Sequence, residues 1–129
     1  MFTRYPNGIS STTGVTGPVS VPIQVASADG AITIKSGIVV ITKGTAAALT
    51  LAAPTAGTAE NGGDDGKILY IDSTTAAAHT VTVSGGLRGA GAGADVGTFG
   101  AAIGNGVALY AYDGDWYVVP GTNLNVTFA

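Results

Sequence analysis

Alternation of apolar with polar or small residues begins near the N-terminus and recurs along most of the chain. Every second residue from Val19 to Val25 is a valine or an isoleucine. A period of two is typical of a strand that buries one of its faces. Pro22 lies inside this segment and has no backbone N–H to donate, so we expect the strand to lie at the edge of a sheet.

Two runs rich in β-branched residues, 31–35 and 38–42, are separated only by Ser36 and Gly37. This spacing predicts a tight hairpin. The first run alternates, whereas the second is apolar on both faces and is expected to be buried on both, either inside a sandwich or against another subunit. Our candidates for self-association are Val39, Ile41 and Leu87.

Further strand-like segments are bounded by turn-forming residues. They are 48–52, which ends before Pro54, then 67–72, 79–83 and the alternating C-terminal segment 124–129. Between the first two, 55–66 is rich in Gly, Ala and Asn and is expected to form a loop. The spacing of strands and turns favours a sandwich or a barrel.

Two glycine-containing segments carry different predictions. Asp113-Gly114-Asp115 separates the apolar and aromatic runs 107–112 and 116–119, and Asp-Gly supplies the positive-φ residues that a hairpin turn requires. The stretch 85–94 consists almost entirely of Gly and Ala, so it can bury almost no side chain. We expect it to be a loop that is mobile or is ordered only by a neighbour.

These patterns predict an all-β fold: a small antiparallel β-sandwich or barrel, jelly-roll or tulip-like, with an extended N-terminal arm. Residues 1–17 contain turn formers and polar residues without a sustained period, and we assign them to the arm. Residues 18–129 form a single β-domain. The arm is either a disordered terminus or a segment that orders on a partner, and its candidate anchors are Phe2, Arg4, Tyr5, Pro6, Asn7 and Ile9.

Composition narrows the classes of function. Only 10% of residues are charged, against about 25% in an average soluble domain, while 46% are hydrophobic and the net charge is −3. Such a neutral, polar surface repels copies of itself only weakly and favours oligomerisation. The five Lys and Arg residues are far apart in the sequence, which argues against nucleic-acid binding. No apolar run approaches the roughly 20 residues of a membrane helix, and residues 1–8 lack the apolar core of a signal peptide.

Candidate chemistry is sparse. His79 is the only histidine and cysteine is absent, so we expect His79 at a surface or half-buried position, and no cofactor. Asp64 and Asp65, with Glu60 and Asn61 nearby, could ligate calcium, but Asp-Gly is also common in turns and we favour a solvated loop. No pair of acids has a neighbour that would raise one pKa, so we expect no enzymatic activity.

Two parts of the chain together resemble structural proteins of tailed bacteriophages. The opening Arg4-Tyr5-Pro6-Asn7-Gly8-Ile9 is similar to the start of such proteins. The second half resembles head-decoration, head-fibre and tail-fibre modules in the ordered segments 42–57, 65–67, 73–82 and 110–119. The resemblance covers residues 1–9 and 42–129, and its motifs are structural rather than catalytic.

The resemblance implies a capsid decoration, or cement, protein. Such a protein is made in the host cytoplasm, forms a homotrimer on the outer capsid surface of the virion, and binds the major capsid protein through a terminal arm. The alternative is a receptor- or carbohydrate-binding knob of a phage fibre, in which Tyr110, Tyr112, Trp116 and Tyr117 stack on sugars. Those aromatic residues could equally fill the core and cover the sheet. A depolymerase fragment is the third alternative.

Overall fold

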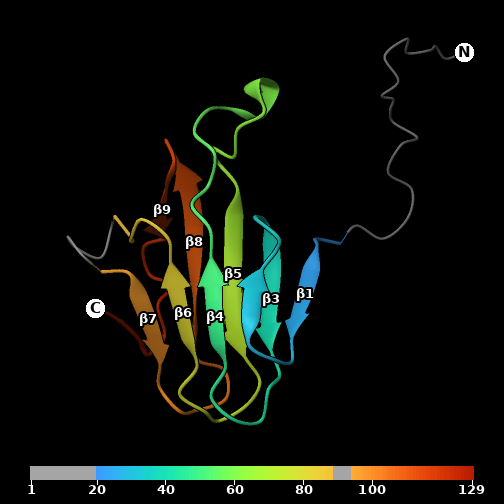
Figure 1. Ribbon diagram of the computed structural model, residues 1–129, viewed down its shortest axis with the longest axis vertical. Helices are drawn as coiled ribbons and strands as arrows, with labels where there is room; N and C mark the ends of the chain where they lie inside the picture. The colour runs from blue at the N-terminus through green and yellow to red at the C-terminus, as the bar shows by residue number, and fades with distance from the viewer. Residues whose placement is uncertain (1–19, 89–93) are drawn as a thin grey trace, which may run out of the picture.

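The computed structural model describes residues 20–88 and 94–129, and its strands form two five-stranded sheets packed face to face (Figure 1). The predicted β-sandwich is confirmed. Sheet A has the order β1-β3-β5-β8-β9, with bounds Ile23–Ala26, Gly37–Ile41, Ile68–Ser73, Gly106–Tyr112 and Asp115–Val118. Sheet B has the order β10-β7-β6-β4-β2, with bounds Val126–Phe128, Val96–Phe99, Thr80–Val83, Ala48–Leu51 and Gly30–Ile32.

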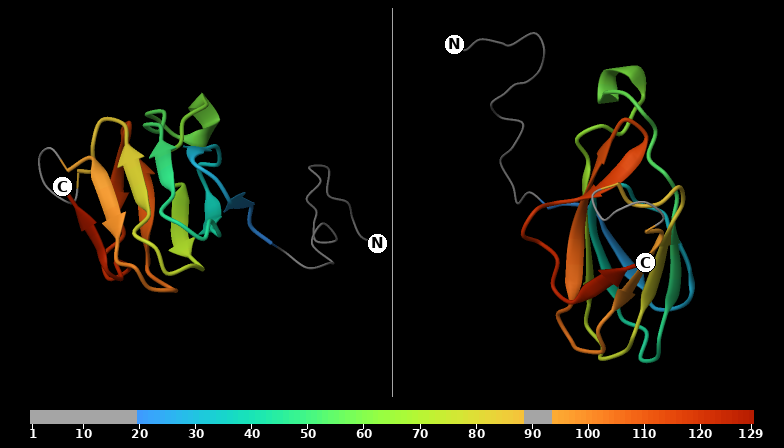
Figure 2. Two further views of the ribbon diagram at one scale, coloured as in Figure 1. Left: turned by 60° about the horizontal axis from the view of Figure 1, so that its bottom comes forward. Right: turned by 90° about the vertical axis from the view of Figure 1, so that its left-hand side faces the viewer.

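The first six strands alternate between the two sheets. Because the chain crosses to the opposite sheet after each strand, it returns to the first sheet running in the same direction, and β1, β3 and β5 pair in parallel, as do β2, β4 and β6. Figure 2 shows the sheets from two further directions. Both sheets are therefore mixed rather than wholly antiparallel. The tight hairpin predicted at Ser36-Gly37 is wrong, since β2 belongs to sheet B and β3 to sheet A.

The predicted hairpin at Asp113-Gly114 is confirmed. β8 and β9 are antiparallel, and Tyr112 lies opposite Asp115. The two residues between them have φ values of 51° and 84°, the left-handed backbone that a two-residue hairpin turn uses. The loop between β4 and β5 is also confirmed; it contains a short 3₁₀ helix, η2, at Ala59–Asn61.

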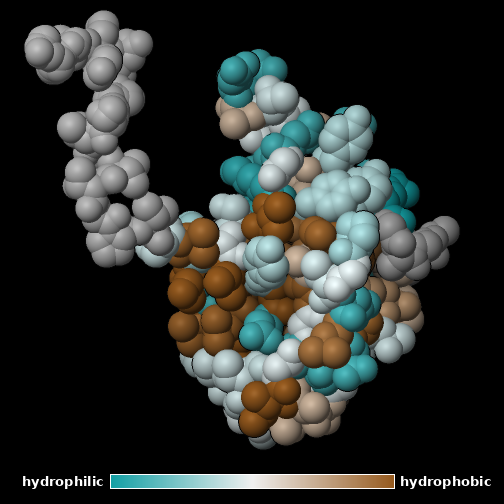
Figure 3. All heavy atoms as spheres, turned by 180° about the vertical axis from the view of Figure 1, so that it is seen from behind, coloured by the Kyte–Doolittle hydropathy of each residue, from teal (hydrophilic) through white to brown (hydrophobic). Residues whose placement is uncertain are grey.

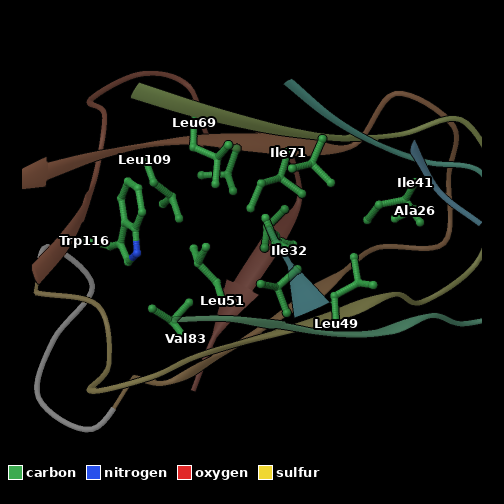
Figure 4. Packing of buried hydrophobic residues seen from close by; sticks show 14 of the residues in the cluster. Ala26, Ile32, Ile41, Leu49, Leu51, Leu69, Ile71, Val83, Leu109 and Trp116 are labelled. Carbon is green, nitrogen blue, oxygen red and sulfur yellow. The ribbon is translucent and has the colours of Figure 1, made fainter. Parts of the chain in front are cut away.

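The core lies between the inner faces of the two sheets (Figure 4). Alternation along β3 directs Val39 and Ile41 toward sheet B, and both are 0% exposed; Leu87 is 2% exposed. These three residues are thus buried within a single chain, and a surface for self-association must consist of other residues. The reason is that β3 is an internal strand of sheet A, so its apolar inner face packs on the opposite sheet.

Two further expectations change in the glycine-rich part of the chain. Leu87 and Ala94 are buried although the stretch 85–94 was expected to bury almost nothing; residues 89–93 lie outside the described part. β7, which the sequence did not indicate, follows this stretch and pairs with β6 and β10.

The proposed N-terminal arm lies outside the described residues, including its six candidate anchors Phe2, Arg4, Tyr5, Pro6, Asn7 and Ile9.

Candidate interaction surface

The outer face of sheet A is rich in exposed apolar and aromatic side chains (Figure 3). On the edge strand, Ile23 and Val25 are each 60% exposed, and Val21 just before it is 54% exposed. The alternation of this segment correctly indicates a strand, and β1 does lie at an edge. The expectation that its valines and isoleucines form the buried face is wrong, since Ala26 points to the core instead.

Strand register brings these side chains into rows across the sheet. Ile23 lies beside Ile38, which lies beside Tyr70. Since residues in register on neighbouring strands point to the same face, these three form one apolar row. In the next row Val25 and Val40 lead to Asp72, the one charged residue of the two rows. The outer face over β1, β3 and β5 is thus nearly uncharged.

Aromatic side chains continue this face over β8 and β9. The rings of Tyr110 and Tyr117 are stacked, with centroids 5.2 Å apart, and Tyr112 lies 6.4 Å from Tyr117. Trp116 points the other way, is 0% exposed and donates its indole N–H to the carbonyl of Ala52 at 2.9 Å. Of the four aromatic residues singled out in this hairpin, three share the outer face and the tryptophan belongs to the core.

Each sheet has two edge strands, and three of the four edges are occupied by other groups of the same chain. We call such an edge closed. At β2, the side-chain amide of Gln24 donates to the carbonyl of Ala31 at 3.0 Å and accepts from the N–H of Thr33 at 2.7 Å. At β10, the amide of Asn123 accepts from the N–H of Val126 at 3.0 Å and donates to its carbonyl at 2.9 Å.

The third closed edge is β9, the far edge of sheet A. Leu87 forms a parallel bridge with Trp116, and the N–H of Arg88 donates to the carbonyl of Trp116 at 3.0 Å. The Arg88 side chain also pairs with Asp115 at 3.1 Å. A backbone hydrogen bond and an ion pair, both made by Arg88, therefore cover part of this edge. Around β1, by contrast, the described residues provide no comparable group for the backbone of Ile23 or Val25.

His79 is buried, contrary to the expectation of a surface or half-buried position. Its Nδ1 accepts the N–H of Ala47 at 3.0 Å, so the ring proton is on Nε2, which lies 2.9 Å from the hydroxyl of Thr75. That hydroxyl donates to the carbonyl of Lys43 at 2.6 Å. Burial lowers the pKa of His79 below its ordinary value, and the charge of Lys43 lowers it further, against an opposing effect of Thr75. The ring is a neutral structural connector.

The two adjacent acids of the β4–β5 loop are also used internally. Asp64 is buried, accepts from Lys67 at 2.7 Å and from the N–H of Thr55 at 2.8 Å, and these hydrogen bonds lower its pKa. Asp65 accepts the N–H of Asp113 at 2.8 Å, which ties the loop to the β8–β9 turn. The loop is therefore cross-linked by its acids rather than merely solvated, and both oxygens of Asp64 and Oδ1 of Asp65 have partners.

Residues 20–88 and 94–129 contain no group of three or more His, Cys, Asp or Glu side chains arranged to hold a metal ion. The same residues include no helix that is long and apolar enough to cross a membrane. No family model matches the chain, and no curated protein or solved structure matches it either.

Proposed function

We propose that the protein is a structural, non-catalytic component of a tailed-phage virion that decorates and stabilises the outside of the capsid. The observation that carries this proposal is the outer face of sheet A, where large apolar and aromatic side chains gather on a nearly uncharged surface. The resemblance described above supplies the class of partner, the major capsid protein; it also implies a homotrimer, which the particle mass measured below tests.

The shape of this face supports a macromolecular partner over a small ligand. Small-molecule sites are concave and bury most of their ligand, whereas this face is an open sheet surface that includes Ile23, Ile68, Tyr70 and Tyr112. Contiguous exposed apolar patches on soluble proteins mark interaction sites. Many copies, each making a moderate contact across the seams of a shell, would stabilise the assembled capsid by mass action and multivalency.

Binding to capsids tests the proposal. Purified protein is added to heads of the encoding phage that lack it, and bound protein is measured by co-sedimentation. We expect Tyr70→Lys to weaken binding, because it places a charge in the apolar row, and Ile103→Lys to leave binding unchanged. Ile103 is 72% exposed and lies outside both sheets, in the loop that connects β7 of sheet B with β8 of sheet A. Absence of binding by the wild-type chain would refute the proposal.

The arm needs a separate test. Deletion of residues 2–12 removes all six candidate anchors and leaves every described strand intact. We expect a folded protein that no longer binds capsids. If the truncated protein binds with unchanged affinity, the arm is not the capsid-binding element, and the outer face of sheet A carries the contact alone.

A carbohydrate-binding knob is the second candidate, and the tyrosine cluster on β8 and β9 favours it. Tyr112 is 57% exposed and can offer a ring face to a sugar. A glycan array should then show specific binding that Tyr112→Ala abolishes. Trp116→Ala is unsuitable for this test because the indole lies in the core. Specific glycan binding together with no capsid binding would reverse the order of the two candidates.

A further inference from the structure

Among the described residues, the β1 edge differs from the other three edges in its cover. From Val21 to Ala26 the sequence contains no charged residue. Natural sheets commonly protect an edge strand with charges, bulges or a covering segment, because exposed backbone groups pair with other chains. The chain bonds to outward backbone groups of β2, β9 and β10 with its own groups. A fourth edge that has neither charges nor such a group among the described residues points to a partner strand.

The backbone of β1 has its remaining hydrogen-bonding groups in the right place. The carbonyls of Pro22 and Ala26 accept from Ile38 and Thr42, so these residues face β3. Because backbone groups alternate in direction along a strand, the N–H and C=O of Ile23 and Val25 point to the outer edge. Pro22, which lacks an N–H, faces β3. The outer edge therefore keeps both of its donors, the N–H groups of Ile23 and Val25.

A second copy of the same edge satisfies these groups in a symmetrical way. An edge strand that meets its own copy across a two-fold axis pairs antiparallel. With Gln24 opposite Gln24 of the second copy, Ile23 of each chain lies opposite Val25 of the other, and each of these pairs exchanges two backbone hydrogen bonds. The side chains of Ile23 and Val25 then extend the apolar rows of one sheet into the next, and no like charges meet.

The closed edges explain why such pairing would stop at two copies. Head-to-tail addition of strands needs two open edges on each chain and produces fibres. In sheet A the far edge is engaged at Trp116 by Leu87 and Arg88, and in sheet B amide side chains bond to Ala31 and Thr33 at one edge and to Val126 at the other. Among the described edges, β1 is therefore the one whose backbone has no such partner, which favours a closed pair over a fibre.

We propose that the β1 edge is a self-association site, at which two copies of the chain join their A sheets into one continuous ten-stranded sheet by antiparallel β1–β1 pairing. The partner is a second copy of this chain, and the contact does not depend on capsid binding. It differs from the three-fold assembly that the resemblance implies, so the mass of the particle distinguishes the two.

Sedimentation velocity on the full chain over a wide concentration range tests the pairing. We expect a particle of twice the 12.6 kDa chain that dissociates on dilution. Val25→Lys brings a charge from each copy to the seam and should weaken association at least about tenfold, equivalent to about 1.4 kcal/mol. The matched control Ile103→Lys adds the same charge at an exposed loop position and should leave association unchanged. At concentrations where the wild type is monomeric, both variants should keep its melting temperature, because pairing then adds nothing to stability.

Hydrogen exchange identifies the contact. The amides of Ile23 and Val25 should exchange more slowly as the protein concentration rises, because only strand pairing covers them. A chain that remains monomeric at every concentration overturns the proposal; slow exchange of both amides in that monomer would assign the edge to residues 1–19 of the same chain. A three-chain particle, or a pair that Val25→Lys leaves intact, overturns it as well.

Discussion

β1 and β9 are the two edge strands of one sheet, and they differ in whether the same chain covers their outer edge. At β9, Trp116 is buried, its carbonyl accepts the N–H of Arg88, and an ion pair covers the strand from outside. At β1, Ile23 and Val25 point their side chains into solvent and their backbone groups to the outer edge. The first edge is part of the single chain's stability, whereas the second contributes little until something binds to it.

This difference distinguishes apolar residues that stabilise the core from apolar residues that are available for assembly. Composition alone cannot make this distinction. A chain with 46% hydrophobic residues and few charges could be stabilised mainly by its core or mainly by assembly. Trp116 and Leu87 belong to the first group, and Ile23 and Val25 to the second. Mutations at the two edges should therefore affect different measurements.

The largest expected effect is at the β9 edge. Trp116→Ala removes a fully buried indole and its hydrogen bond to Ala52, and truncation of a buried aromatic residue costs about 3–5 kcal/mol. Ile23→Ala at the β1 edge should lower the free energy of unfolding by about 0.5 kcal/mol or less, because exposed positions rarely affect stability. Urea unfolding at low protein concentration measures both. Equal losses would show that β1 is already covered in the single chain.

Much of the contrast between the edges could be predicted from local sequence. Asp113-Gly114 correctly indicated the hairpin that ends in β9, because this signal depends on the backbone preferences of single residues. The edge position expected from Pro22 is confirmed, although Pro22 faces β3 and its missing N–H is not at the outer edge. The alternation of 19–25 gave the strand but not the direction of its faces. Period two determines which residues share a face, and the position of that face depends on the rest of the fold.

The pairing of strands could not be predicted from the same patterns. Ser36 and Gly37 suggest a hairpin, yet the chain there crosses from sheet B to sheet A. A crossing and a hairpin use similar turn residues, and only contacts distant in sequence distinguish them. The closed edges at β2 and β9 were missed for the same reason, since Gln24 contacts residues 7 to 10 positions away and Trp116 accepts from Arg88, which is distant in the sequence.

Lowering the pH should reduce the free energy of unfolding while leaving self-association through β1 unchanged. The pKa of His79 is lowered by burial, so as the pH falls below about 6.5 the unfolded chain takes up a proton before the folded chain does, and stability decreases by at most about 1.4 kcal/mol per pH unit. β1 contains no titratable side chain. Urea unfolding between pH 8 and 5 should therefore show declining stability, while self-association of the folded chain stays constant.

The variant His79→Gln is the control for this pH dependence. It lacks the titrating ring, so its stability should change less between pH 8 and 5 than that of the wild type, whatever its absolute value. A wild-type chain whose stability is flat over this range would contradict the neutral, buried role assigned to His79. Association that changes with pH in the folded protein would show that groups outside β1 contribute to the contact.

Opening a closed edge should have a smaller effect than emptying the core. Asn123→Ala leaves the N–H and C=O of Val126 without their side-chain partner, and the loss should be about 1–2 kcal/mol. The edge at β10 would then resemble β1, so this variant should also associate beyond pairs at high concentration. Asn61→Ala, at an exposed position in η2, is the matched control and should do neither. If Asn123→Ala associates like the wild type, edge closure does not limit assembly.

The smallest effect is expected at Arg88. Its side chain is 59% exposed and pairs with Asp115, and exposed ion pairs contribute about 0–1 kcal/mol. Arg88→Ala keeps the N–H that donates to Trp116, so the main-chain part of the closure persists, and both the unfolding free energy and the particle mass should stay close to those of the wild type. Raising the salt concentration should reproduce the same small loss in the wild-type chain by screening the pair. If Arg88→Ala instead forms particles larger than two chains, charge rather than main-chain pairing keeps the β9 edge from associating, and the two edges of sheet A differ by a single side chain.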